Sequence, residues 1–169
     1  MTTSVNQVPR KPDWRFLLEH PAHFFAFGFG AGLARKAPGT YGTLVALPLY
    51  HWLLAWGLSA GMIALLCAPL FVFGIWVCDK SCRSLGVHDH GGIVWDEIVA
   101  MLLVLTAVPV SLTAWIMAFA LFRLFDIVKP WPIRWLDAKV HGGFGVMLDD
   151  LVAALFAMAV LRLLLPWIS

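Results

Sequence analysis

The chain is built mostly from long apolar runs separated by short polar stretches. A helix needs roughly 20 mainly apolar residues to cross the hydrocarbon core of a bilayer. Runs near that length predict about five transmembrane helices, which cover residues 43–60, 61–78, 93–110, 112–129 and 151–168. The first run contains Pro48 and His51 and is the least regular. The pattern therefore predicts an all-α fold, a polytopic membrane helix bundle.

Two shorter features precede these runs. The stretch from Phe24 to Leu33 is apolar, brief and rich in glycine, which favours a short interfacial or re-entrant N-terminal element over a span. Residues 1–20 are polar and charged and predict a cytoplasmic N-terminal segment. We expect residues 21–169 to form a single membrane domain.

Composition agrees with membrane residence. The 169 residues are 61% hydrophobic and 13% charged, whereas ordinary globular domains carry about 25% charged residues. A water-soluble domain of ~150 residues buries only about 70% of its unfolded surface and could not hide this much apolar area. Three cysteines are too few for a disulfide framework, and a net charge of +2 gives no reason to expect a nucleic-acid partner.

The few charges lie on one side of the predicted bundle. Following the five runs through the bilayer places the connections near residues 57–61 and 109–113 on one face, and neither contains a charged residue. All ten acids and eleven of the twelve bases fall on or near the other face, with Arg162 as the exception. Because Lys and Arg mark the cytoplasmic side, the charged face and the N-terminus are predicted to be cytoplasmic.

The first polar stretch on that face, residues 28–43, is rich in glycine. Its exposed backbone N–H groups, with Lys36 and Thr40, are suited to holding an anion near a helix start. Glycines also permit tight helix packing in lipid. The spacing matches neither a phosphate-binding P-loop nor a dinucleotide fingerprint, so both interpretations stay open.

The second stretch, residues 85–97, carries two kinds of polar group. His88, Asp89 and His90 are suited to metal binding or proton transfer, and equally to a solvated loop. Asp96 and Glu97 open an apolar run, where ionisable groups are costly and usually functional. Exposure just outside the lipid headgroups is the alternative for this acidic pair.

The remaining two stretches also place charges at predicted helix ends. Arg123, Asp126 and Lys129 recur three residues apart, which fits either a helix-capping ion pair or a phosphate clamp. Asp149 and Asp150 precede the last run, where stabilisation by the helix dipole competes with a functional role.

Taken together, several carboxylates lie at helix ends on one face, at Asp96, Glu97, Asp126, Asp149 and Asp150. Carboxylates crowded near lipid repel one another unless a cation neutralises them, and oxygen ligands suit Mg²⁺ better than Zn²⁺. Neighbouring basic residues suit a phosphorylated substrate. The residues alone therefore predict a cytoplasm-facing, Mg²⁺-dependent site for an anionic lipid.

Four of these stretches resemble the phosphatidylglycerophosphatase A (PgpA) family of bacteria, over about Phe24 to Ala153. They read APGTYGT (37–43), GVHDHGGIVWDE (86–97), FRLFDIVKPWPIR (122–134) and HGGFGVMLDD (141–150). The resemblance implies a multi-pass phosphatase of the bacterial cell inner membrane, acting in phospholipid metabolism. Members of this family hydrolyse phosphatidylglycerophosphate to phosphatidylglycerol and phosphate, and they require Mg²⁺. Arg35 stands where the family commonly has proline, so it receives no role.

On this resemblance, we assign roles to the residues of the motifs. The metal core is predicted at Asp96, Glu97, Asp149 and Asp150. Asp126 joins the catalytic group as a fifth acid. Phosphate binding is predicted at Lys36, Thr40, Arg123 and Lys129. Proton transfer is assigned to His88, Asp89 or His90, with the nucleophile left open between water and an aspartate.

A membrane transporter or channel for a cation or an anionic solute is the alternative. Such proteins also collect carboxylates in a bundle, but they favour ionisable groups near the bilayer midplane. Here only His51 lies deep in a predicted span, which weighs against transport.

Overall fold

The computed structural model describes residues 11–87, 89–164 and 166, and all the regular structure in them is helical. In chain order the elements are α1 (Trp14–Glu19), α2 (Pro21–Ala26), the 3-10 helix η1 (Gly28–Leu33), α3 (Pro38–Ala55), α4 (Ala60–Leu85), α5 (Trp95–Leu105), α6 (Leu112–Val128), α7 (Ile133–Lys139) and α8 (Gly142–Leu164). The predicted all-α fold is confirmed for this part of the chain.

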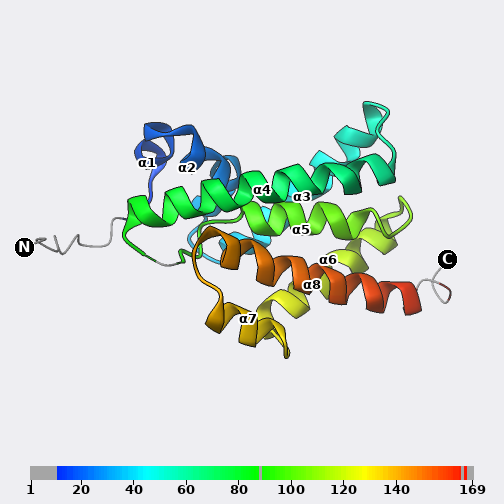
Figure 1. The fold of residues 1–169 in the computed structure, drawn as a ribbon. Coiled ribbons are helices and arrows are strands. Elements are labelled where there is room, and N and C mark those ends of the chain that lie inside the picture. Colours follow the sequence, from blue (N-terminus) through cyan, green and yellow to red (C-terminus); the bar gives the residue numbers. More distant parts are fainter. Residues whose placement is uncertain (1–10, 88, 165, 167–169) are drawn as a thin grey trace, which may run out of the picture.

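Helix α5 lies at the centre of the bundle. It packs against α3, α4, α6 and α8, and nine of its eleven residues are buried. Figure 1 shows α5 between α4 and α8. A helix that is apolar all round is stable only when neighbours cover every face. Its central position carries the first-turn acids Asp96 and Glu97 into the interior of the protein.

The bundle has two unlike ends. Helices α1, α2 and α7 gather at the end where α5 and α8 begin, as Figure 1 shows. The connections after α3 and after α5 lie at the other end, together with the last turn of α8. Residues 56–59 and 106–111, which form these connections, contain no charged side chain. The predicted one-sided placement of charge therefore matches the arrangement of the helices.

The span boundaries differ from the predicted ones. By length and composition, two of the described helices can cross a membrane, α4 and α8. Helix α5 has eleven residues, which corresponds to about 16 Å, well below the ~30 Å hydrocarbon core. Beyond Leu105 the chain continues in tight turns up to Pro109, with the Thr106 hydroxyl donating to Leu103 O at 2.6 Å. A count of about five spans is therefore not confirmed.

The last helix begins nine residues earlier than predicted, at Gly142 and not at residue 151. The reason is close packing: a Cβ on Gly143 would collide with the carbonyl oxygen of Ile75 in α4. Asp149 and Asp150 consequently lie about two turns inside α8. The expectation that they sit at a helix N-terminus is wrong, and capping by the helix dipole does not explain them.

The N-terminal elements cover the polar end of the bundle. Phe16 and Leu17 of α1 are buried, and Phe16 stacks on His23 of α2 with ring centroids 4.2 Å apart. The Val94 amide donates to Ala26 O at 2.8 Å, which fixes the loop before α5. Residues 24–33 form part of α2 and all of η1; their predicted interfacial or re-entrant position in a membrane stays a prediction.

Candidate active site

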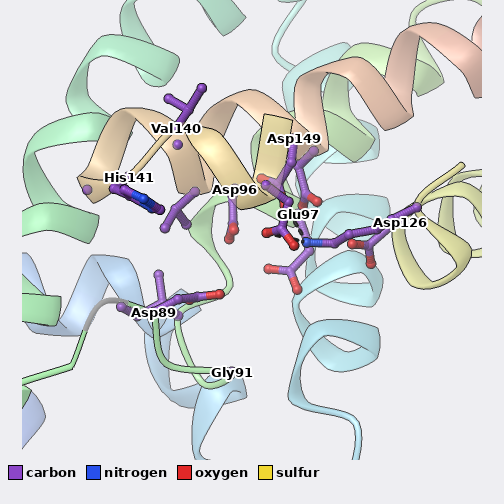
Figure 2. A pocket seen from close by; sticks show the side chains of 15 residues that line it. Asp89, Gly91, Asp96, Glu97, Asp126, Val140, His141 and Asp149 are labelled. Atoms are coloured by element: carbon purple, nitrogen blue, oxygen red, sulfur yellow. Dashed lines mark hydrogen bonds and ion pairs between the residues drawn. The ribbon is translucent and has the colours of Figure 1, made fainter. Parts of the chain in front are cut away.

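A pocket opens at the polar end of the bundle, which we call the acidic pocket. It draws side chains from the loop before α5, from α5 and α8, and from the segment that joins them through α6 and α7 (Figure 2). The polar residues that line it are Asp89, Asp96, Glu97, Asp126, Lys129, Asp137, His141, Asp149 and Asp150. Three of the four polar stretches predicted to share one face of the membrane, those that contain Asp96, Asp126 and Asp150, thus meet in one cavity.

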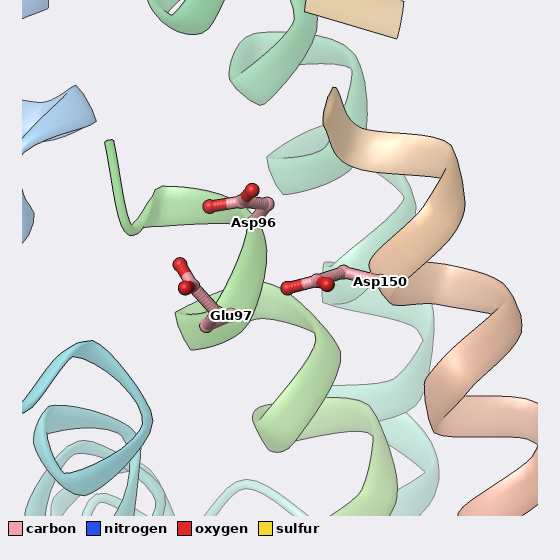
Figure 3. A group of neighbouring side chains, drawn as sticks. All are labelled: Asp96, Glu97 and Asp150. Carbon is pink, nitrogen blue, oxygen red and sulfur yellow. The ribbon is translucent and has the colours of Figure 1, made fainter. Parts of the chain in front are cut away.

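Three carboxylates form the innermost part of this pocket. Asp96 and Glu97 come from the first turn of α5, and Asp150 from α8. One oxygen from each lies within 4.8 Å of the others, and Figure 3 shows Asp150 directed toward the start of α5. The indole N–H of Trp95 donates to Leu70 O at 3.2 Å, which fixes the start of α5 against α4. These three residues have the arrangement of a metal site.

Buried oxygens in the pocket lack hydrogen-bond donors. Among the described residues, no donor reaches Asp96 Oδ1, Glu97 Oε2, Asp149 Oδ1 or Asp150 Oδ2. Burial of a carboxylate without a partner is costly, unless a cation compensates the charge. Ligands that are all carboxylate oxygens suit a hard cation of the Mg²⁺ or Ca²⁺ type. The residues present therefore fit a hard divalent cation.

Arg123 of α6 lies beside this cluster. Its Nη1 is 2.5 Å from Asp126 Oδ2 and 3.8 Å from Glu97 Oε1. The three side chains are only 12–13% exposed, so water screens the ion pairs weakly. Arg123 Nε has no acceptor among the described residues. The Arg123 side chain is thus held in place by Asp126 and Glu97, and its Nε–H group is available to donate a hydrogen bond to a ligand.

Lys129 is a second basic residue beside the acids of the pocket. It follows the last residue of α6 and its Nζ is 2.5 Å from Asp149 Oδ2 and 2.9 Å from Asp137 Oδ1. Burial alone would lower the pKa of the ammonium, but hydrogen bonds and charge attraction from these two carboxylates more than offset it and hold the pKa above its usual value. Lys129 is therefore a fixed positive charge.

Of the residues predicted for proton transfer, the structure describes Asp89 and His90, and it places them differently. Asp89 lines the acidic pocket, on the side away from Asp126 (Figure 2). His90 does not line it, and its Nδ1 accepts a hydrogen bond from the Gly92 amide at 3.0 Å. His88 lies outside the described residues. Of the three, Asp89 is the one that the structure places at the cavity.

The glycine-rich stretch serves mainly to bring helices together. Lys36 is exposed and Thr40 is half-buried, and neither lines the acidic pocket. Gly39 lies directly against Glu97: an added Cβ would collide with Glu97 Oε1 and approach Arg123 Nη1 to 3.0 Å. At Gly42 a Cβ would approach Val94 to 2.6 Å. These two positions support the helix-packing interpretation of the stretch.

Two of the polar lining residues received no role from the sequence. Asp137 of α7 pairs with Lys129, and His141 lies in the connection between α7 and α8. A signal was available for both, because residues 129–150 are predicted to lie on the charged face, and HGGFGVMLDD begins with His141. Their contribution depends on the turn through α7, which sequence spacing does not specify.

Comparison with known proteins agrees with this geometry. The family model described as phosphatidylglycerophosphatase A matches residues 24–165. A protein named phosphatidylglycerophosphatase A from Haemophilus influenzae is 45% identical over 157 residues, which cover 92% of this chain and 96% of the relative. The Escherichia coli protein of the same name is 42% identical over 161 residues, covering 91% of each chain.

No solved structure matches the chain. The family match spans every helix from α3 to α8 and includes all the residues that line the acidic pocket. The chain therefore belongs to the phosphatidylglycerophosphatase A family.

Proposed function

We propose that the protein hydrolyses phosphatidylglycerophosphate to phosphatidylglycerol and inorganic phosphate, with the reaction in the acidic pocket. Membership of the family gives the substrate, because the two relatives are named for this activity. The observation that carries the location is the set of buried carboxylate oxygens without donors, on Asp96, Glu97, Asp149 and Asp150. A site built in this way needs a cation, and a phosphate monoester is an anion that such a cation attracts.

We propose Mg²⁺ as the cation. Asp96, Glu97 and Asp150 would hold it, with Asp149 beside them. When bound, Mg²⁺ supplies charge that polarises the phosphoryl oxygens. Mg²⁺ is commonly bound through one or two carboxylates together with substrate phosphate oxygens, which agrees with a cluster of three at the inner wall of an open pocket.

The basic residues then act on the phosphoryl group. Charge builds up on its oxygens as the bond to the glycerol oxygen breaks, and stabilising that charge is the main task in phosphoryl transfer. Arg123 holds positive charge beside Glu97 and Asp126, and Lys129 holds it beside Asp149. Because Asp126, Asp137 and Asp149 hold them in place, little reorganisation is needed during the reaction.

Proton transfer has two candidates at the pocket. The leaving glycerol oxygen needs a proton, and the attacking water must lose one. Asp89 and His141 are suited to this role, because both line the pocket and both side chains can accept and donate a proton. Of the two, Asp89 is our choice, because it is the one to which the sequence motif assigned proton transfer; His141 is the second candidate, and a variant with Asp89 replaced that keeps its turnover would favour it.

We further propose that α3, α5 and α6 cross the membrane with α4 and α8, with the acidic pocket and the N-terminus on the cytoplasmic side of the inner membrane. The one-sided distribution of Lys and Arg supports this orientation. Helices α3 and α6, with 18 and 17 residues, are at the lower limit of the length that a span requires. The short α5 is surrounded by them and by α4 and α8, so it has little need to span the core alone.

The test is phosphate release from phosphatidylglycerophosphate by the purified protein, with Mg²⁺ and with a chelator. We expect turnover only with Mg²⁺. Asp150→Ala and Glu97→Ala should each abolish Mg²⁺-dependent release while expression and the unfolding temperature in detergent stay near those of the unmodified protein. Near-normal turnover in both variants would contradict the site. An ion-flux signal in proteoliposomes without phosphatase activity would instead support the transport alternative.

A further inference from the structure

An apolar groove begins at the inner wall of the acidic pocket. It lies between α4, α5 and α8, and its lining consists of Ala64, Cys67, Ala68, Phe71, Val72, Asp96, Val99, Ala100, Leu103, Met147 and Leu151. Of these described residues, Asp96 alone is charged, and Asp96 also lines the acidic pocket. The groove and the pocket therefore meet at the proposed metal site.

The groove runs away from the polar end of the bundle. On α5 its lining starts at Asp96 and reaches Leu103, which is about 10 Å along the helix axis. That is roughly two-thirds of one leaflet of a ~30 Å hydrocarbon core. Its direction is that of a lipid tail whose headgroup lies at the membrane surface.

Small side chains create the space. Ala64 and Ala68 are one turn apart on α4, and Ala100 of α5 lies on the opposite wall. The one polar group on the floor is satisfied, because the thiol of Cys67 donates to Val99 O at 3.9 Å. Apart from Asp96 at its end, the described lining is apolar or satisfied, which suits a hydrocarbon chain and does not suit water or an ion.

We propose that this groove holds one acyl chain of the phospholipid substrate and thereby places the phosphate at Asp96. The inference rests on the proposed function. It adds that an acyl chain of the substrate determines where the phosphate group lies in the pocket. A lipid tail gains little hydrophobic free energy by moving from the bilayer into a protein groove, because both surroundings are apolar. The groove therefore contributes by orienting the substrate. An acyl chain that lies along α5 places the headgroup of the same lipid beside Asp96, where the groove meets the acidic pocket.

The first test fills the groove. Ala68→Trp places an indole at its lining, and Ala64→Trp does the same one turn further from Asp96. Ala159→Trp is the matched control, since Ala159 is an exposed alanine of α8 outside the lining. With long-chain phosphatidylglycerophosphate we expect Ala68→Trp to lower turnover by ~10-fold or more, because small displacements of a reacting group are costly. With a short-chain phosphatidylglycerophosphate the loss should be within ~2-fold, as it should be for the control on both substrates.

Equal losses on long and short chains, or equal losses in the control, would overturn the proposal.

The second test does not depend on activity. If the unmodified protein hydrolyses neither lipid, the proposed function is contradicted, and the binding of the acyl chain in the groove can still be measured by crosslinking. Phosphatidylglycerophosphate carrying a photoreactive diazirine in one acyl chain, presented in micelles, is crosslinked to the unmodified protein and the adducts are mapped by mass spectrometry. We expect adducts in segments 64–72, 99–103 and 147–151, and their loss in Ala68→Trp. Labelling confined to other lipid-facing residues, unchanged in Ala68→Trp, would refute the groove as a tail site.

Discussion

At the scale of single residues, the charges of the acidic pocket are paired unevenly. Lys129 contacts the carboxylates of Asp149 and Asp137, whereas Asp96 and Asp150 each keep a buried oxygen without a donor among the described residues. Removal of one partner from a buried ion pair leaves an uncompensated charge, at a cost of about 3–5 kcal/mol. The paired and unpaired acids should therefore respond differently to substitution.

Lys129→Met tests the paired side. We expect turnover to fall by about 10²-fold, because the substitution removes a positive charge next to the phosphoryl group and frees Asp149. A raised pKa means that the ammonium's contribution is complete at neutral pH and is lost only as the pH rises through that value, above the usual lysine range. The ratio of unmodified to variant turnover should thus stay constant between about pH 6 and pH 9.

The control is Lys139→Met, an exposed lysine in the last turn of α7 that does not line the pocket. It should leave both turnover and its pH profile unchanged. A ratio for Lys129→Met that falls toward one as the pH approaches 9 would show that Lys129 loses its proton in this range, contrary to the described environment.

At the scale of elements, the contact between α3 and α5 shapes the site. The start of α3 reaches Glu97 because Gly39 has no side chain. The hydroxyl of Thr43 donates back to Gly39 O at 2.8 Å and is buried with it. This stretch was predicted to be either an anion cradle or a packing surface, and at Gly39 the packing surface lies directly against Glu97 of the acidic pocket.

Gly39→Ala follows from that contact. In most helices a change from glycine to alanine stabilises the protein by roughly 0.5–1 kcal/mol. Here the added Cβ would displace the Glu97 carboxylate, so we expect no gain in stability and a loss of turnover of about 10-fold or more. Turnover and thermal unfolding in detergent measure the two effects.

Gly61→Ala in α4 is the matched substitution, since its Cβ would meet only Ser59 Oγ, at 3.9 Å. It should keep full activity and be neutral or slightly stabilising. If Gly39→Ala behaves as Gly61→Ala does, then Glu97 is not held against α3 in the way described.

The start of α8 shows what the sequence pattern leaves undetermined. Hydropathy predicts the existence of the helices well, because each apolar run becomes a helix. It places the start of α8 too late, since the polar stretch before Asp149 is read as a loop although Gly143 allows it to pack as helix against α4. The close approach of two helix backbones depends on tertiary packing, so it cannot be predicted from the hydropathy of a single segment.

At the scale of the whole molecule, most of the charges lie at one end of the bundle, with Arg162 in the last turn of α8 at the other end, and this distribution supports the orientation that we propose. The five acids predicted to share one face do meet at one pocket, so the sequence predicts well which of its acids lie together. It does not predict that Asp137 joins them, because that depends on the path of the chain through α7. Motif spacing specifies which residues share a face, and the tertiary path decides which of them touch.

Cysteine labelling checks the orientation. Ser59→Cys lies in the uncharged connection after α3, and Ala138→Cys on the exposed side of α7 at the charged end. The native cysteines, Cys67, Cys78 and Cys82, are buried, so their background labelling should be low. In spheroplasts, a maleimide that cannot cross membranes should label Ser59→Cys at once and Ala138→Cys only after permeabilisation. The reverse pattern would place the acidic pocket outside the cell.

The central claim is that the buried carboxylates hold the cation on which hydrolysis depends. The most direct measurement is phosphate release from phosphatidylglycerophosphate across a Mg²⁺ titration, for the unmodified protein, Asp150→Asn and Asp79→Asn. Asp79 is the control because its carboxylate pairs with exposed Arg83 outside the acidic pocket. We predict Mg²⁺-dependent turnover for the unmodified protein and Asp79→Asn, and a loss of ~10²-fold or more for Asp150→Asn that saturating Mg²⁺ does not restore. Turnover that needs no divalent cation, or an Asp150→Asn variant with an unchanged Mg²⁺ dependence, would contradict it.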